Sequence, residues 1–466
     1  MTATSPPPAT TSPMRRVVGA SLVGTTIEWY DFFIYASAAS LVFGKLFFSA
    51  LGPAAGLLAS FATLGVSFVV RPLGGILAGH IGDRVGRKGV LVTTLLLMGI
   101  STVGVGLLPT YGAIGVAAPI LLVLLRLLQG VSAGGEWGGA ALMSVEHAPH
   151  GRRGWFGSFP QLGVPIGLLL ANLVFFAVAG LTTDAQFLAW GWRIPFLISV
   201  VLIAVGFVIR SRVDESPVFS ELRRRRARRS APLRELLRHH RRQIVIAIGL
   251  FVANTMIGYV LIAFITSYGT RTLGVSSATM LLVGIAGAVS WGVFTMIAGR
   301  WSDRVGRRTV YLVGAIALLA WPFPFFLLLD TASVPLMLLA VVVLGVGLGL
   351  TYGQQAATYA EMFPVAVRYS GVSFAYALGA VLGGAFAPLV SAWLIDATGT
   401  SLSVSAYMTI AALITLAAVL ALRERPAAER DAFVDGADEA DESDASDEDA
   451  ADRTVTGPAS RTTSDA

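Results

Sequence analysis

Ten residues, Gly79-His-Ile-Gly-Asp-Arg-Val-Gly-Arg-Lys88, return in similar form as Gly299-Arg-Trp-Ser-Asp-Arg-Val-Gly-Arg-Arg308. Each copy follows a long apolar stretch and combines a glycine with charged side chains, as expected of a tight connection between helices. Six predicted apolar segments separate the two copies, and an even number of membrane crossings preserves orientation. The repeat therefore predicts two parallel halves related by an axis along the membrane normal.

The composition excludes an ordinary soluble protein. The 466 residues are 55% hydrophobic and 13% charged, against roughly 25% charged residues in soluble domains, and mean hydropathy is +0.72. The same values exclude a disordered chain, which needs low hydrophobicity and high charge. Cysteine is absent, so disulfides, thiolate metal sites and a cysteine nucleophile are excluded as well.

Twelve apolar stretches are long enough to cross about 30 Å of hydrocarbon. They cover residues 17–43, 55–80, 89–108, 119–145, 156–179, 194–213, 243–268, 279–299, 309–329, 334–359, 369–395 and 403–422. The sequence therefore predicts an all-α membrane protein with twelve transmembrane helices in two six-helix bundles.

The segments between these stretches predict the domain organisation and orientation. We expect a disordered tail at 1–14, a first bundle at 15–213, a basic linker at 214–242, a second bundle at 243–423 and an acidic disordered tail at 424–466. Arginine and lysine concentrate in the alternate loops that share a side with the N-terminus, which places both termini in the cytoplasm of a cytoplasmic-membrane protein. The basic linker suits anionic lipid headgroups, whereas nucleic-acid binding would need a folded basic domain.

Two copies of the pattern G-x-x-x-D-R-x-G-R-K/R, after the second and eighth helices, resemble the major facilitator superfamily over about residues 15–423. Further motifs resemble its metabolite:proton symporter family: Glu28-Trp-Tyr-Asp-Phe-Phe-Ile-Tyr35, Arg71-Pro-Leu-Gly-Gly75, Arg126-Leu-Leu-Gln-Gly-Val-Ser-Ala-Gly-Gly-Glu-Trp-Gly-Gly139, Gly191-Trp-Arg-Ile-Pro-Phe196 and Glu361-Met-Phe-Pro364. That family includes transporters for shikimate, 2-oxoglutarate, citrate and proline or betaine. Residues 183–192 look most like the shikimate-type members.

The resemblance implies a secondary transporter that takes up a small organic acid, such as shikimate or another carboxylated metabolite, together with protons by alternating access. A proton-coupled proline or betaine symporter, an uncoupled facilitator or exporter, and a receptor without transport stay open as alternatives. The acidic tail has no apolar heptads, which disfavours the osmolyte transporters that carry a coiled coil there. We expect a monomer in the lipid bilayer that is not an enzyme and uses no cofactor except the proton.

Five ionisable residues interrupt the apolar stretches of the first half, and an ionised group at mid-membrane costs about 2.5–3.5 kcal/mol. We assign proton coupling to Glu28, Asp31 and Glu136, and substrate binding to Arg126 and Arg71. Arg126 can pair with Asp31 and be released when that carboxylate takes a proton. Alternatively, the pair is a permanent structural contact, Glu136 closes the cytoplasmic side, and Arg71 anchors a helix end by snorkelling.

The second half contributes uncharged hydrogen-bonding groups, of which we select Asn254, Gln354, Gln355 and Tyr259 as substrate ligands, although such groups are often interhelical contacts. The repeated loops supply the predicted gating residues Asp83, Arg84, Arg87, Asp303, Arg304 and Arg307. An aspartate there can meet a helix N-terminus and an arginine across the interface between the halves. The histidines form no metal-ligand pattern, and the absence of a Gly-rich loop ending in Lys-Ser/Thr excludes ATP use.

Overall fold

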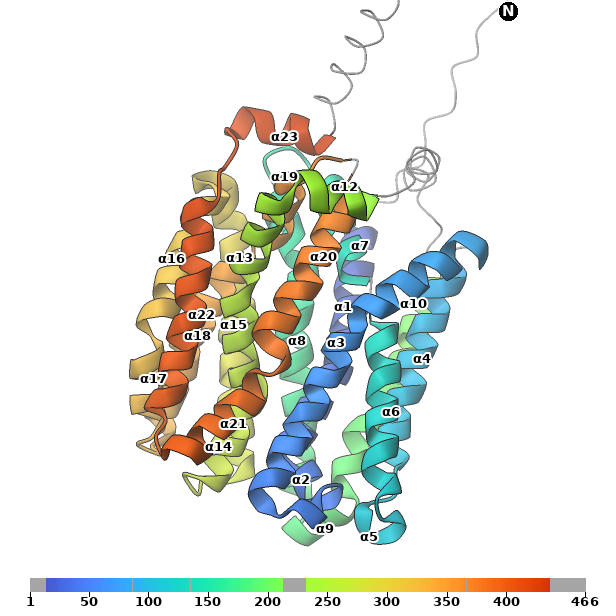
Figure 1. Ribbon diagram of the computed structural model, residues 1–466, viewed down its shortest axis with the longest axis vertical. Helices are drawn as coiled ribbons and strands as arrows, with labels where there is room; N and C mark the ends of the chain where they lie inside the picture. The colour runs from blue at the N-terminus through green and yellow to red at the C-terminus, as the bar shows by residue number, and fades with distance from the viewer. Residues whose placement is uncertain (1–13, 86, 134–135, 213–231, 366, 436–466) are drawn as a thin grey trace, which may run out of the picture.

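Helices account for nearly all of the regular structure in the computed structural model of the chain, which describes residues 14–85, 87–133, 136–212, 232–365 and 367–435. The long helices run side by side along one axis of an elongated bundle (Figure 1). This follows from the sequence, because an apolar segment in a bilayer satisfies its backbone N–H and C=O groups internally only as a helix or a closed barrel.

Six apolar segments make up the first half. They are α1 (Met14–Ala38), continued by the π-helical turn η1 (Ala39–Phe43) and α2 (Gly44–Leu46); α3 (Pro53–Val85); α4 (Arg87–Leu107); α6 (Ala117–Ser132) with α7 (Glu136–Glu146); α8 (Arg153–Leu181); and α10 (Ile194–Arg212). Short helical turns lie in the connections: η2 (Ser49–Leu51), α5 (Tyr111–Ile114), α9 (Asp184–Ala189) and η3 (Gly191–Arg193).

The second half repeats this order. Its segments are α13 (Arg241–Tyr259) with the π-helical turn η4 (Val260–Phe264) and α14 (Ile265–Arg271); α15 (Ser277–Val305); α16 (Arg307–Ala320) with α17 (Pro322–Leu329); α18 (Val334–Tyr352) with α19 (Gln355–Met362); α20 (Arg368–Ala380) with η5 (Val381–Ala385) and α21 (Ala387–Thr398); and α22 (Leu402–Ala421). A π-helical turn thus interrupts the first helix of each half at corresponding places.

The predicted number of crossings agrees with these helices. Within the described ranges, nine helices are long and apolar enough to span a bilayer, and α16 with α17, bent by 46°, makes a tenth. The shorter apolar helix Thr93–Leu107 and α1 complete the set of twelve.

The two halves contact each other at both ends of the bundle. Two short helices, α12 (Pro232–His239) and α23 (Ala427–Asp435), lie at one end, and α2, α5 and α9 lie at the other (Figure 1); we call these the α23 end and the α2 end. α8 packs along α15 between the halves. They approach closely because glycines face each other: a methyl group on Gly299 would lie 2.7 Å from the Gly154 carbonyl oxygen. At the α2 end, the Ser40 hydroxyl donates to the Ala263 carbonyl at 2.7 Å.

The predicted disorder of residues 424–466 is wrong for the first part of that segment, which forms α23. Phe433 and Val434 are buried, and Asp431 pairs with Arg153 of α8 at 3.1 Å. The Phe433 and Val434 carbonyls accept hydrogen bonds from Arg368 of α20 at 2.9 and 2.8 Å. This short stretch therefore has apolar and ionic partners, which the composition of the whole tail conceals. Residues 436–466 and 213–231 lie outside the described part of the chain.

Candidate functional site: a cavity between the halves

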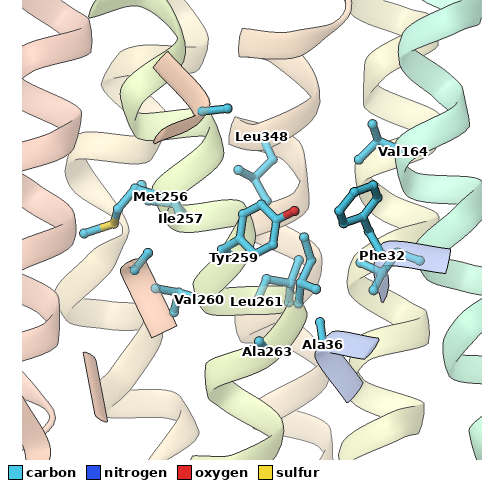
Figure 2. Packing of buried hydrophobic residues seen from close by; sticks show 14 of the residues in the cluster. Phe32, Ala36, Val164, Met256, Ile257, Tyr259, Val260, Leu261, Ala263 and Leu348 are labelled. Carbon is cyan, nitrogen blue, oxygen red and sulfur yellow. The ribbon is translucent and has the colours of Figure 1, made fainter. Parts of the chain in front are cut away.

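A narrow cavity of about 20 Å³, with room for about one water molecule, lies between the two halves. Its walls are mostly aromatic, and helices α1, α8, α13, α15, α18 and α20 all contribute. The lining residues are Trp29, Phe33, Val164, Phe251, Asn254, Thr255, Gly258, Tyr259, Ile262, Trp291, Tyr352 and Tyr376. Figure 2 shows the Tyr259 ring of α13 with its hydroxyl oxygen directed toward Phe32 of α1. Both halves therefore supply walls to one shared space, and among the described residues no charged side chain lines it.

Three donors that line this cavity are unsatisfied. The indole N–H groups of Trp29 and Trp291 and the hydroxyl of Tyr259 find no hydrogen-bond partner among the described residues. All three side chains are buried, with 3–5% of their surface exposed. Buried donors are almost always paired in folded proteins. A bound molecule with acceptor oxygens would satisfy them.

Asn254 lies in this wall, but its amide is also held by the protein. Its Nδ2 donates to the Leu348 carbonyl and to the Thr351 hydroxyl, both at 2.9 Å. These bonds fix the side chain against α18. Asn254 therefore makes an interhelical contact and also lines the cavity, so it has features of both alternatives that the sequence left open.

Gln354 and Gln355 do not line the cavity, contrary to their selection as substrate ligands. They lie where α18 ends and α19 begins, and the Gln354 Nε2 donates to the Leu350 carbonyl at 2.7 Å. The Gln355 Oε1 accepts from Gln161 of α8 at 3.3 Å. The break between α18 and α19 places the Gln355 amide in the contact between the halves and bonds the Gln354 amide back to α18, and the sequence does not reveal that break.

Arg71 lies beside the cavity, inside α3, and only 6% of it is exposed. Its guanidinium carbon lies 4.2 Å from the ring centroids of Phe32 and Phe68 and 5.4 Å from that of Trp29. Its Nε and Nη2 have no hydrogen-bond partner among the described residues. An arginine that snorkels to a helix end would reach solvent. The burial of Arg71 therefore favours the substrate-binding alternative over the anchoring one.

Asp31 and Arg126 are connected indirectly rather than as the predicted ion pair. Asp31 accepts hydrogen bonds from Ser199 at 2.7 Å and Thr102 at 3.1 Å. Arg126 donates to Gln129 at 2.6 Å and to Ser67 at 3.2 Å. Gln129 in turn donates to Thr102 at 2.6 Å. No salt bridge joins the two charges in the described structure.

Helix geometry explains this separation. Trp29 and Phe33 face the cavity, and Asp31 is about 200° around the helix axis from Trp29. The carboxylate therefore points into the first bundle, toward α4 and α10. α3 packs closely against α6 at Gly130, where an added methyl group would lie only 2.4 Å from the Ser67 carbonyl oxygen. This close packing brings Ser67 to Arg126. Gly130 permits this close approach because it has no side chain.

The structure gives less information about the two other predicted proton carriers, Glu28 and Glu136. Glu28 is buried, with 5% of it exposed. The side chain of Glu136 lies outside the described part of the structure, and so do those of Asp83, Arg84 and Arg87 in the first repeated loop.

The second repeated loop joins the halves at the α23 end. Asp303 accepts hydrogen bonds from the backbone N–H groups of Gly154 and Trp155, both at 2.8 Å, at the N-terminus of α8. Arg307 pairs with Asp303 at 2.7 Å and with Glu361 at 3.1 Å. The predicted contact of an aspartate with a helix N-terminus across the interface is confirmed for this copy, whereas the arginine that pairs with Asp303 is Arg307 of the same half. Arg304 is exposed, and gating by these residues stays a prediction.

Sequence reasoning missed the uncharged partners of the buried charges: Ser67, Thr102, Gln129 and Ser199. Gln129 was visible in principle, because it lies three residues after Arg126 on the same helix face. The others come from α3, α4 and α10, and no spacing in the sequence connects them to α1 or α6. Among the described residues, no cluster of histidine, aspartate and glutamate could hold a metal ion.

The sequence and fold match known transporters. The family model described as the Major Facilitator Superfamily matches residues 21–375 and 291–443. The chain belongs to the major facilitator superfamily. It is 42% identical over 415 residues to the inner membrane metabolite transport protein YhjE of Escherichia coli K12, covering 88% of this chain and 94% of that protein. It is 38% identical over 416 residues to the Escherichia coli K12 shikimate transporter, with the same two coverages.

A crystal structure of the D-xylose–proton symporter has the same fold, with a TM-score of 0.71 at 21% identity, covering 90% of this chain and 99% of that one. The predicted fold class is therefore confirmed: an all-α membrane protein with two six-helix bundles. The resemblance to metabolite transporters of this superfamily is confirmed as well. The chain is a multi-pass inner-membrane transporter of the superfamily and not an enzyme.

Proposed function

We propose that the protein takes up a small organic acid, such as shikimate or another carboxylated metabolite, together with protons by alternating access. The observation that carries this proposal is the pairing of buried charges with a cavity rich in unsatisfied donors. Arg71 lies beside the cavity, and its Nε and Nη2, like the N–H or O–H groups of Tyr259, Trp29 and Trp291 in the cavity wall, have no hydrogen-bond partner among the described residues. A carboxylate and its neighbouring oxygens are acceptors for such a set.

In this mechanism the substrate carboxylate binds near Arg71 and Arg126, and hydroxyl or carbonyl oxygens accept from the aromatic donors. Asp31 carries the coupling proton within the first bundle, and Glu28 and Glu136 are further candidates for that role. The two halves then rock against each other around the cavity. The proton is the only cofactor, and a monomer in the lipid bilayer performs the cycle without ATP or nucleic acid.

We assign the α23 end to the cytoplasm, because the basic loops gather there. Asp303 binds the N-terminus of α8 at that end, with Arg307 of its own half bonded to it, and breaking the bonds to α8 opens the cavity inward. The hydrogen bond from Ser40 to the Ala263 carbonyl plays the corresponding role at the α2 end. Alternate opening of the two ends moves the substrate across the bilayer.

A second candidate, proton-coupled uptake of betaine or proline, is favoured by one feature of the cavity. Its walls are mostly aromatic, with no charged side chain in the part of the lining that the structure describes. Aromatic walls suit a quaternary ammonium group through cation–π attraction. The similarity to the proline/betaine transporter of Escherichia coli K12, 32% over 420 residues, agrees with this candidate. An uncoupled facilitator or exporter is the third.

Purified protein in liposomes separates these candidates. An inward proton gradient is imposed, shikimate, citrate, 2-oxoglutarate, betaine and proline are supplied in turn, and an internal dye reports acidification. We expect one of the carboxylates to accumulate and to acidify the lumen. Accumulation of betaine or proline alone would select the second candidate. Equilibration of a substrate with no proton movement would reject symport.

A further inference from the structure

Four side chains form a continuous hydrogen-bonded chain from Arg126 to Asp31. Arg126 Nη1 donates to the Gln129 Oε1 at 2.6 Å, the Gln129 Nε2 donates to the Thr102 hydroxyl at 2.6 Å, and that hydroxyl lies 3.1 Å from Asp31 Oδ2. Three helices contribute, namely α6, α4 and α1. All four side chains are buried, with at most 1% of each exposed. The chain is therefore shielded from water along its whole length.

Every bond in this chain points the same way. Arg126 donates to the oxygen of the Gln129 amide, the N–H group of that amide donates to the Thr102 hydroxyl, and the hydroxyl donates to the Asp31 carboxylate. Hydrogen bonds in such a row polarise one another, and low local dielectric strengthens the effect. The positive charge of Arg126 thereby stabilises the negative charge of Asp31 without direct contact.

The Thr102 hydroxyl can turn. It has one proton and two acceptors, because its oxygen also lies 2.9 Å from the Met98 carbonyl. When Asp31 is ionised, the hydroxyl gains most by donating to the carboxylate. When Asp31 carries a proton, the hydroxyl can donate to Met98 instead and still accept from Gln129. The orientation of the Thr102 hydroxyl therefore depends on the protonation state of Asp31, and this orientation affects the hydrogen bond from Gln129.

We propose that Thr102 and Gln129 are positioning residues that couple protonation of Asp31 to anion binding at Arg126. The inference rests on the proposed function, proton-coupled transport of a carboxylate, and names the atoms that would carry the coupling. When Asp31 is neutral, it no longer interacts electrostatically with the positive charge of Arg126 through Thr102 and Gln129. The guanidinium is then free to bind a substrate carboxylate more tightly, and the bound anion in turn favours protonation, since coupling between two sites is reciprocal.

The charged and titratable groups around the chain are few. Asp31 faces Arg126 of α6, with uncharged Thr102 of α4 and Ser199 of α10 as its hydrogen-bond donors. Arg126 also faces Arg71 of α3, Tyr35 of α1 and Tyr259 of α13. Tyr30 neighbours Asp31 on its own helix. Among these described groups, Asp31 is the acidic side chain within reach of Arg126.

The test compares two substitutions at Thr102 and two at buried amides. Thr102→Val removes the hydroxyl and keeps the shape, whereas Thr102→Ser keeps the hydroxyl. Gln129→Leu removes the central amide. Asn172→Leu removes an equally buried amide on α8 that bonds Ser37 and not the chain. The Kd of shikimate is measured by calorimetry from pH 5.5 to pH 8 on purified protein.

We expect the wild-type protein, Thr102→Ser and Asn172→Leu to have a Kd for shikimate at pH 5.5 that is lower than at pH 8 by about tenfold or more. Thr102→Val and Gln129→Leu should lose most of this dependence and vary by less than about threefold. A pH dependence in both variants equal to that of the wild type would overturn the inference. If one variant does not fold, the other decides the question.

A second measurement needs no ligand and separates this inference from the proposed function. Infrared difference spectra of the wild type assign the carboxylic-acid band of Asp31 through its loss in Asp31→Asn. We expect the pH at which that band disappears to change in Thr102→Val and Gln129→Leu and not in Thr102→Ser. Proton-coupled uptake by Asp31→Asn would contradict the proposed role of Asp31. If Asp31→Asn loses proton coupling but the pH at which the band disappears is unchanged in Thr102→Val and Gln129→Leu, only the proposed role of Thr102 and Gln129 is rejected.

Discussion

The two halves of the molecule have the same helix order and bury different chemistry. The first half buries Asp31, Arg71 and Arg126, together with the neutral groups that solvate them. The second half places neutral donors such as Asn254 and Tyr259 at the same depth. A buried charge is costly unless it is bonded, so the first half needs a network of hydroxyls and amides around the charges inside its helices, whereas the second half buries Arg307 and Arg368 at the start of helices, at the α23 end.

The repeat sharpens this comparison at single positions. Arg71 precedes Asp83 by the same number of residues as Trp291 precedes Asp303. One half therefore offers a guanidinium where the other offers an indole N–H, and both groups are unsatisfied. In the proposed function, the two walls would recognise different parts of a ligand: charge on one side, shape and neutral oxygen on the other.

The largest effect should follow removal of the proton site. With one proton per substrate, a gradient of one pH unit sustains about tenfold accumulation. Asp31→Asn is expected to abolish accumulation and to leave exchange of internal for external substrate intact, because exchange needs no net proton movement. Uptake and counterflow in liposomes measure the two processes. Asp184→Asn, at an exposed acidic residue of α9, is the control, and accumulation by Asp31→Asn would break the comparison.

A smaller effect should come from the two corresponding walls. Arg71→Leu removes charged hydrogen bonds worth about 1.5–3 kcal/mol and should weaken carboxylate binding about 10–150-fold. Trp291→Phe keeps the ring, loses one neutral donor and should weaken binding about 2–10-fold. Calorimetry with the transported acid gives both values. Equal losses at the two positions would show that charge does not distinguish the halves.

Closure of the α23 end provides the next test. Asp303→Asn loses the charge that binds the N-terminus of α8 and Arg307, which should shift the equilibrium toward inward opening about 10–100-fold. The chain has no cysteine, so Ser373→Cys introduces a sole thiol. Ser373 lies against Gly138 across the interface, and its labelling rate by a maleimide should rise with opening.

The control for that measurement is Asp330→Asn, at the opposite end of the bundle, where the carboxylate accepts from Tyr268 of the same half. It is expected to leave labelling of the cysteine unchanged. An increase in both variants would point to general loosening rather than to a gate.

The smallest effect is expected at α23. Asp431 is partly exposed in its pair with the buried Arg153, and solvent access to the carboxylate brings the pair toward the value for surface ion pairs, about 0.2–1 kcal/mol. Asp431→Ala should therefore lower Tm by about 1–2 °C and leave substrate affinity unchanged. Differential scanning fluorimetry and calorimetry check the two statements. A large rise in transport rate would instead identify α23 as a brake on opening.

Local patterns were sufficient for much of this protein. Apolar length identified the helices, the repeated loops identified two parallel halves, and charges inside apolar stretches marked Asp31, Arg71 and Arg126. These features are readable because each depends on a few neighbouring residues. They also predicted the contact of Asp303 with a helix N-terminus, since that chemistry belongs to the loop itself.

The sequence by itself determined the twelve helices, their order and the half with charges inside its apolar segments, because hydropathy and charge act along each segment. Only the tertiary structure decided which atoms meet. It separated Asp31 from Arg126 by Thr102 and Gln129, moved Gln354 and Gln355 out of the cavity, and turned the indoles of Trp29 and Trp291 into it. The reason is that the rotation of each helix about its axis is set by packing against its neighbours, and these lie far away in the chain.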